Sequence, residues 1–209
     1  MTDHNALIEQ LGRAASPVTR PRRVEWRTLS WTLVALPCGW LASLLVPRES
    51  TDWLQPGALL AALQLLLAFI TGFFAVRNAL IISIAGRRPL GWRTFAPLLL
   101  LWGATLLFSI GHAPLTGHAL SETRCYAFMV TVSVPMLLLA IIWIRRTRTL
   151  TPLRSLSAAG CGVGCMAVTL LSFCHPLHLH PGDLAMHAAA FATIVAATVL
   201  LGWRWVTVR

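Results

Sequence analysis

Residues Gly57–Val76 read GALLAALQLLLAFITGFFAV, a run of 20 residues without one charged side chain. An α-helix needs roughly 20 consecutive apolar residues to cross the ~30 Å hydrocarbon core of a bilayer. The apolar residues form a block of membrane length and not one face of a surface helix. This segment is therefore predicted to span a membrane.

Five further blocks have the same character and nearly the same length. They cover Leu29–Val46, Thr94–Gly111, Cys125–Ile144, Leu156–Phe173 and Leu184–Gly202. Hydrophobic residues make up 56% of the 209-residue chain and charged residues only 11%, whereas charged residues form about a quarter of a typical soluble domain. The chain is therefore predicted to be an all-α polytopic membrane protein with six transmembrane helices.

The residues outside these blocks form two termini and short loops. Residues 1–28 are predicted to be a cytoplasmic amphipathic tail, residues 29–206 a single six-helix transmembrane domain, and residues 207–209 a cytoplasmic C-terminus. No loop has room for an extramembrane catalytic domain, so the chain is not expected to be an enzyme.

The positive charge is distributed unevenly along the chain. All 17 basic residues are arginines and the net charge is +10, but only Arg48 and Arg124 fall in the first and third loops. Cytoplasmic loops of membrane proteins retain Arg and Lys, which explains this charge without direct nucleic acid binding. Both termini are therefore predicted to be cytoplasmic. Tryptophans sit at the span ends, where their rings favour the headgroup layer: Trp26, Trp53, Trp92, Trp143, Trp203 and Trp205.

Sulfur and imidazole groups collect on the opposite, outer side. Cys125 opens the fourth span, and the last outer loop and the start of the sixth span contain Cys174, His175, His178, His180 and His187. Thiolate and imidazole are ligands for zinc, copper and other thiophilic ions, and two cysteines at similar depth could instead form a disulfide. A third interpretation is that His and Pro simply end short loops, since the spacing matches no standard metal motif.

Cys161 and Cys165 lie one helical turn apart in the fifth span. They could bind a soft metal, but Gly160 and Gly164 also form a small-x-x-x-small pattern that lets helices approach closely. Close packing is the favoured interpretation. Arg77 and His187 are the ionisable residues nearest to apolar surroundings, where such groups are candidates for function, although Arg77 could also reach the headgroups as a snorkelling side chain.

The N-terminal tail has an apolar stripe at helical spacing, formed by Leu7, Ile8, Leu11, Ala14, Ala15 and Val18. A helix of about a dozen residues is marginal in water and needs a surface against which to bury its stripe. The lipid headgroup layer and the groove of a soluble protein both fit this requirement.

The order of these features resembles the NrsF-like family of six-span anti-sigma factors. The resemblance covers nearly the whole chain and depends on short motifs in a fixed order. The matching residues are Leu7, Ile8, Leu11, Pro17, Val18, Arg20, Arg77, Cys125, Pro135, Arg145, Arg146, Pro152, Leu153, Arg154, Cys174 and His187.

The resemblance implies a bacterial inner-membrane protein that sequesters an extracytoplasmic-function sigma factor and releases it on an envelope, heavy-metal or redox signal. Three groups of residues would carry this function. Leu7, Ile8, Leu11 and Val18 would bind the sigma factor; Cys125, Cys174, His175, His178, His180 and His187 would sense the signal; Arg77, Arg145, Arg146 and Arg154 would transmit it. No cofactor would be required, although Cys125 and Cys174 could hold a thiophilic metal ion transiently.

Two other functions fit parts of the pattern. A membrane thiol oxidoreductase usually carries a C-x-x-C pair at a span end, and the chain has none. A small metal transporter could use Cys161, Cys165 and His187, but transport sites generally need carboxylates or several ligands near the midplane. The predicted spans contain no Asp or Glu.

Overall fold

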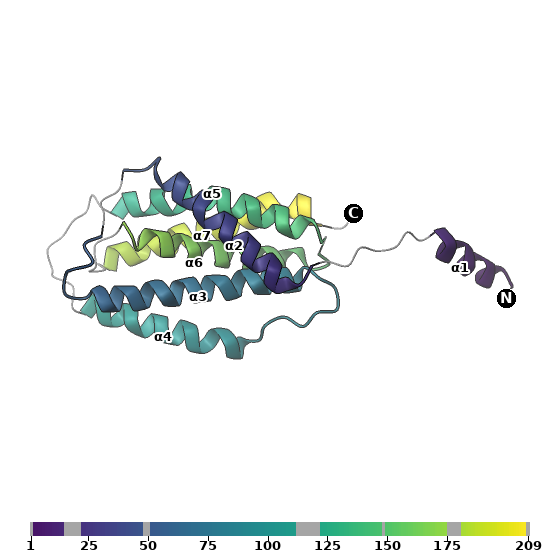
Figure 1. Cartoon of the computed structure of the whole chain (residues 1–209), viewed down its shortest axis with the longest axis horizontal. Coiled ribbons are helices and arrows are strands. Elements are labelled where there is room, and N and C mark those ends of the chain that lie inside the picture. The colour runs from purple at the N-terminus through teal and green to yellow at the C-terminus, as the bar shows by residue number, and fades with distance from the viewer. Residues whose placement is uncertain are drawn as a thin grey trace.

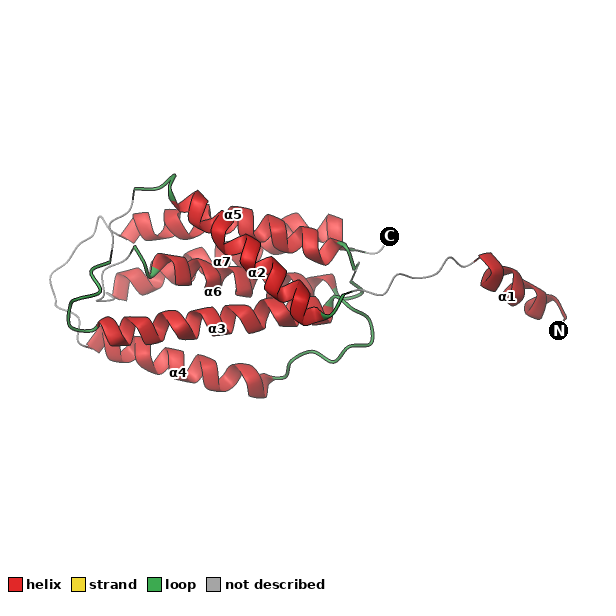
Figure 2. Ribbon diagram, viewed as in Figure 1, coloured by secondary structure: helices red, strands yellow, loops and turns green. Residues whose placement is uncertain are grey.

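The computed structural model describes residues 2–14, 22–47, 51–111, 122–147, 149–174 and 181–207. The regular secondary structure of this part of the chain is all helical, with one isolated bridge between Thr149 and Thr207 and no named strand (Figures 1 and 2). The helices are α1 (Thr2–Ala14), α2 (Val24–Ser43), α3 (Ala58–Ile82), α4 (Trp92–Gly111), α5 (Glu122–Arg145), α6 (Pro152–Leu171) and α7 (Pro181–Val206).

Four of the described helices are long and apolar enough to cross a membrane. These segments are Ala58–Ile82, Arg124–Arg145, Pro152–Leu171 and Gly182–Val206. For the described residues, the structure therefore confirms an all-helical fold with helices suited to a bilayer. Helices α2 and α4 overlap the other two predicted spans, and the count of six spans stays a prediction.

Helices α2 to α7 pack side by side in a bundle, and α1 lies apart from them (Figure 1). Helix α6 is the most buried of the four segments that could span a membrane, and it packs against α3, α5 and α7. Helix α4 packs mainly on α3. The centre of the bundle is therefore α6, and α4 lies at its edge.

Small residues let α6 occupy this central place. On its α7 side, a Cβ added at Gly160 would lie 2.8 Å from Val195 Cα, and one at Gly164 would lie 2.6 Å from the ring of Phe191. Both distances are too short for a side chain. The close packing predicted from these two glycines is confirmed, in agreement with the use of small residues where membrane helices meet.

On its α3 side, α6 meets a second pair of glycines. A Cβ added at Gly162 would lie 2.9 Å from the backbone nitrogen of Val76, and one at Gly72 would lie 2.9 Å from Cys165 Cβ. Cys165 is buried at this contact, where it acts as a small packing residue.

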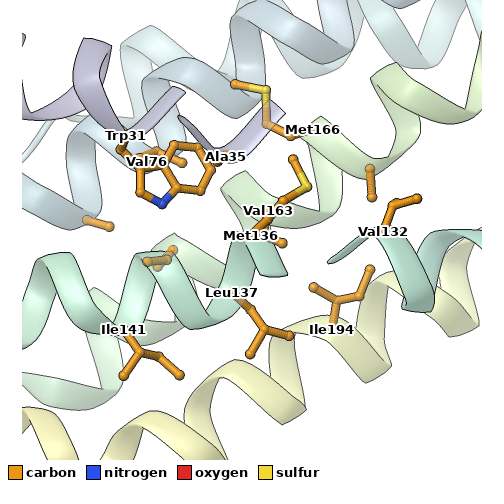
Figure 3. Close-up of a cluster of buried hydrophobic side chains, with 14 of the residues drawn as sticks. Trp31, Ala35, Val76, Val132, Met136, Leu137, Ile141, Val163, Met166 and Ile194 are labelled. Atoms are coloured by element: carbon orange, nitrogen blue, oxygen red, sulfur yellow. The ribbon is translucent and has the colours of Figure 1, made fainter. Parts of the chain in front are cut away.

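The core of the bundle combines side chains from five helices. Trp31 of α2 lies near Val76 of α3, and residues of α5, α6 and α7 complete the cluster (Figure 3). Its largest fully buried side chains include Trp31, Met129, Met136, Leu156, Met166 and Ile194. Dense apolar packing of this kind fixes the relative positions of the helix ends.

The two ends of the bundle differ in chemistry. At one end α2, α4 and α6 begin and α3, α5 and α7 end; here Thr149 Oγ1 donates to the carbonyl oxygen of Ile82 over 3.4 Å. We call this the arginine end, because most arginines of the described chain lie here: Arg22, Arg23, Arg27, Arg77, Arg87, Arg88, Arg93, Arg145, Arg146, Arg154 and Arg204.

At the opposite end the backbone N–H of Thr51 donates to the carbonyl oxygen of Phe173 over 3.1 Å, and the rings of Trp53 and Phe173 lie 5.9 Å apart. We call this the cysteine end, because Cys125 and Cys174 lie there. The separation of arginines from these cysteines was expected from the sequence. Which compartment each end faces stays a prediction.

Candidate functional site

Helix α1 presents an exposed apolar face. The side chains of Leu7, Ile8 and Leu11 are 52%, 67% and 62% exposed. Their i, i+3 and i, i+4 spacings place them on one side of the helix. Arg13 and Glu9 pair over 2.8 Å one turn apart. Three of the four residues predicted to bind a sigma factor are therefore available together, and Val18 lies outside the described residues.

At the cysteine end, the two predicted sensing cysteines both contact the hydrophobic core of the bundle. Cys125 is buried within the main hydrophobic cluster, and the partly buried Cys174 packs against the same cluster. All five cysteines fall within the described chain and are thiols, not disulfides. Cys125 lies in the first turn of α5, whereas Cys174 follows the end of α6.

Of the four histidines predicted to accompany these cysteines, one lies within the described residues. His187 is half-buried in α7, and His175, His178 and His180 lie outside the described residues. Within the described ranges, no three His, Cys, Asp or Glu side chains are grouped as a metal site. The described part of this end thus contains two thiols, one imidazole and the buried carboxyl of Asp183 in the first turn of α7.

The arginine end contains a buried polar cluster around Arg27, whose side chain is only 8% exposed. Its Nη2 donates to the carbonyl oxygen of Trp143 over 3.0 Å and to Thr147 Oγ1 over 3.5 Å. The Thr147 hydroxyl in turn donates to Ser83 Oγ over 2.9 Å. Arg27 therefore ties the start of α2 to the ends of α5 and α3. Burial lowers the pKa of the Arg27 guanidinium, and the positive charge of Arg146 lowers it further.

Sequence reasoning missed this role, because Arg27 falls within residues 1–28, which are predicted to form the cytoplasmic tail. A signal was present: Val24, Arg27, Thr28, Trp31 and Ala35 recur at helical spacing, and all five are buried. Helix α2 begins at Val24, ahead of the predicted start of the first span at Leu29. The last residues of the predicted tail therefore belong to the bundle.

Arg77 forms an ion pair that joins α3 to the start of α2. Its Nη2 lies 3.2 Å from Glu25 Oε1. A hydrogen bond from its own backbone N–H lowers the pKa of the Glu25 carboxyl, and the hydrogen bond from Arg77 lowers it further. Arg77 therefore has a carboxylate partner that hydropathy alone did not reveal.

The other arginines predicted to transmit a signal have separate surroundings. The Arg145 guanidinium lies 4.9 Å from the centre of the Trp205 ring, and that of Arg146 lies 5.2 Å from the centre of the Trp143 ring. Arg154 is exposed at the start of α6. The structure thus places all four at the arginine end, in three different settings.

A cavity of about 1070 Å³ opens beside the Arg27 cluster. Its lining includes the arginines Arg22, Arg23, Arg27 and Arg146 and the tryptophans Trp26 and Trp143. Within the described part of the chain, no carboxylate lines it. This combination of guanidinium groups and indole rings suits an anionic ligand with an apolar part.

No protein-family model, curated protein sequence or solved structure matches the chain. The function is therefore inferred from the residues of α1 and of the two ends of the bundle.

Proposed function

We propose that the chain is an integral-membrane anti-sigma factor of a bacterial inner membrane. It would hold an extracytoplasmic-function sigma factor through α1 and release it when the cysteine end responds to a metal or redox signal. The observation that carries this proposal is the exposed apolar face of α1, which lies apart from the bundle (Figure 1).

The composition of α1 favours a protein groove over the lipid surface. Helices that lie on membranes usually carry Lys or Arg on their polar face. Within Thr2–Ala14 there is one arginine, Arg13, against two acids, Asp3 and Glu9. A short amphipathic helix of this kind is typical of segments that dock into a hydrophobic groove. Each apolar side chain that becomes fully buried there contributes about 1.5–3 kcal/mol.

Helix α5 connects the two ends of the bundle and could transmit a movement from the cysteine end to the arginine end. Cys125 lies near its start and Arg145 at its end, so at 1.5 Å per residue they are about 30 Å apart along the axis. The carbonyl of Trp143, near the end of α5, accepts the hydrogen bond from Arg27 of α2, and α2 is the helix that follows α1. A shift of α5 would therefore reach the helix next to the sigma-binding segment. A change in sigma affinity of about 1–3 kcal/mol would suffice for release.

The test of α1 is co-purification of the full-length protein with each extracytoplasmic-function sigma factor of the same organism. The variant Leu7→Ser/Leu11→Ser should retain at least about tenfold less sigma factor, because two buried side chains are lost. The matched control is Leu54→Ser, which removes a 97% exposed leucine at the cysteine end and should retain sigma factor as the wild type does. Undiminished binding by the α1 variant would contradict the proposal.

The test of the sensing end uses the same complex with cadmium ions or an oxidant added. Wild type should release the sigma factor, whereas Cys125→Ser and Cys174→Ser should hold it. Cys38→Ser removes a half-buried thiol of α2 and should behave as wild type. Equal release from all three variants would eliminate the cysteine pair from the mechanism.

A further inference from the structure

The cavity at the arginine end has an unbalanced charge. Four guanidinium groups line it, from Arg22, Arg23, Arg27 and Arg146, and no carboxylate of the described chain does. The nearby acid Glu25 is paired with Arg77, on the side of α2 that faces α3. Positive groups gathered in a partly apolar pocket repel one another and raise the local concentration of anions.

The deepest of these groups has an unused donor. Arg27 is 8% exposed, and its Nη2 is occupied by Trp143 and Thr147. Its other terminal nitrogen, Nη1, is buried and has no hydrogen-bond partner among the described residues. Leaving a buried charged donor unpaired is costly. Because Arg27 lines the cavity, a turn of the buried guanidinium toward it would let an oxygen of a bound anion accept this hydrogen bond.

The cavity also has apolar walls, and it lies at the end of the bundle, which is the level of the lipid headgroups when the helices cross a bilayer. Trp26 is 65% exposed, Trp143 stacks with Arg146, and Ile84 and Ala85 continue the lining beyond the end of α3. Indole rings favour the membrane interface. A free phosphate would contact the guanidinium groups but not these apolar walls, whereas a phospholipid would contact both.

We infer that this cavity is a binding site for the headgroup of an anionic phospholipid. The phosphate lies among the four guanidinium groups and accepts a hydrogen bond from Arg27 Nη1, and the glycerol backbone packs against Trp26, Ile84 and Ala85. Basic pockets at the cytoplasmic ends of membrane helices commonly bind such headgroups. The bound lipid joins α2 to the end of α5, and the inference does not depend on the identity of the protein partner.

The test is native mass spectrometry of the full-length protein in detergent with phosphatidylglycerol or phosphatidylcholine. The pocket variant is Arg22→Gln/Arg23→Gln, which removes two exposed arginines of the lining. The control is Arg87→Gln/Arg88→Gln, an adjacent exposed pair at the same end of the bundle that does not line the cavity. Both variants lose the same charge, and neither removes a buried side chain.

The wild type should bind phosphatidylglycerol in preference to phosphatidylcholine. Each basic residue near an anionic lipid is worth roughly fivefold in binding, so the pocket variant should lose at least about tenfold of its affinity and the control much less. An equal loss of phosphatidylglycerol affinity in both variants would show that the lipid is attracted by the general positive charge of this end, and it would contradict a specific site. Equal binding of the two lipids would also overturn it, as would displacement of phosphatidylglycerol by millimolar inorganic phosphate or by an acidic peptide.

Discussion

At the scale of single residues, two neighbouring charges at the start of α2 have opposite surroundings. Arg27 faces the bundle with Val24 and Trp31, whereas Glu25 is exposed and pairs with Arg77 of α3. A hydropathy window ends at the first charge, so the sequence placed the span boundary at Leu29. The helix begins earlier because Arg27 finds acceptors on α5 and beyond it. Helical spacing could have revealed the buried face, but the acceptors come from distant segments and could not be read from α2.

The ion pair between Glu25 and Arg77 gives a pH-dependent prediction. Because the folded protein lowers the pKa of Glu25, the pair stabilises fully above the ordinary carboxyl pKa and is lost as the pH falls through the lowered value. The melting temperature of wild type should exceed that of Glu25→Gln by a small constant amount between about pH 6 and 8, and the difference should shrink progressively as the pH falls below the ordinary carboxyl pKa. Thermal unfolding in detergent measures it.

The control for this experiment is Glu9→Gln, which removes a carboxylate from α1, apart from the bundle (Figure 1). It should leave the melting temperature of the bundle unchanged at every pH. A difference between wild type and Glu25→Gln that persists at the acid limit would show that Glu25 acts through packing and not through its charge.

At the scale of helices, the position of α6 follows from its glycines. The sequence predicted that Gly160 and Gly164 allow close approach, and they meet α7. The contact with α3 was not predicted, because it needs Gly162 on one helix and Gly72 on another, and no spacing within one segment reveals a match between two. Hydropathy locates apolar segments but does not indicate which of them pack against each other.

The glycine contact between α3 and α6 predicts a loss of stability in Gly162→Ala. The new methyl group would lie 2.5 Å from Val76 Cγ2 and 2.9 Å from Val76 N, so the helices must separate. Overpacking of this kind costs about 1–3 kcal/mol. The control is Gly103→Ala in α4, where a Cβ meets nothing within 4 Å and helix propensity favours alanine by about 1 kcal/mol. The free energy of unfolding in detergent should fall for the first variant only; equal losses would contradict the packing argument.

At the scale of the whole molecule, most arginines lie at one end of the bundle, and Cys125 and Cys174 lie at the other. The alternation of arginine-rich and arginine-poor loops was sufficient to predict this arrangement, because each helix crosses from one end to the other. The chain order did not predict that Arg27, Ser83 and Thr147 would meet, since they come from three segments. The uneven distribution of arginines between the two ends of the bundle can thus be predicted from the sequence. The polar cluster around Arg27 depends on tertiary packing.

This uneven distribution of arginines predicts which sites a membrane-impermeant thiol reagent can reach. In a background with all five native cysteines replaced by alanine, Leu54→Cys places a thiol at a 97% exposed position of the cysteine end. Arg88→Cys places one at an exposed position of the arginine end. Because arginine-rich loops stay in the cytoplasm, intact cells should be labelled at position 54 only, and position 88 should react after permeabilisation. The reverse pattern would place α1 outside the cell, where no sigma factor exists, and the anti-sigma proposal would fail.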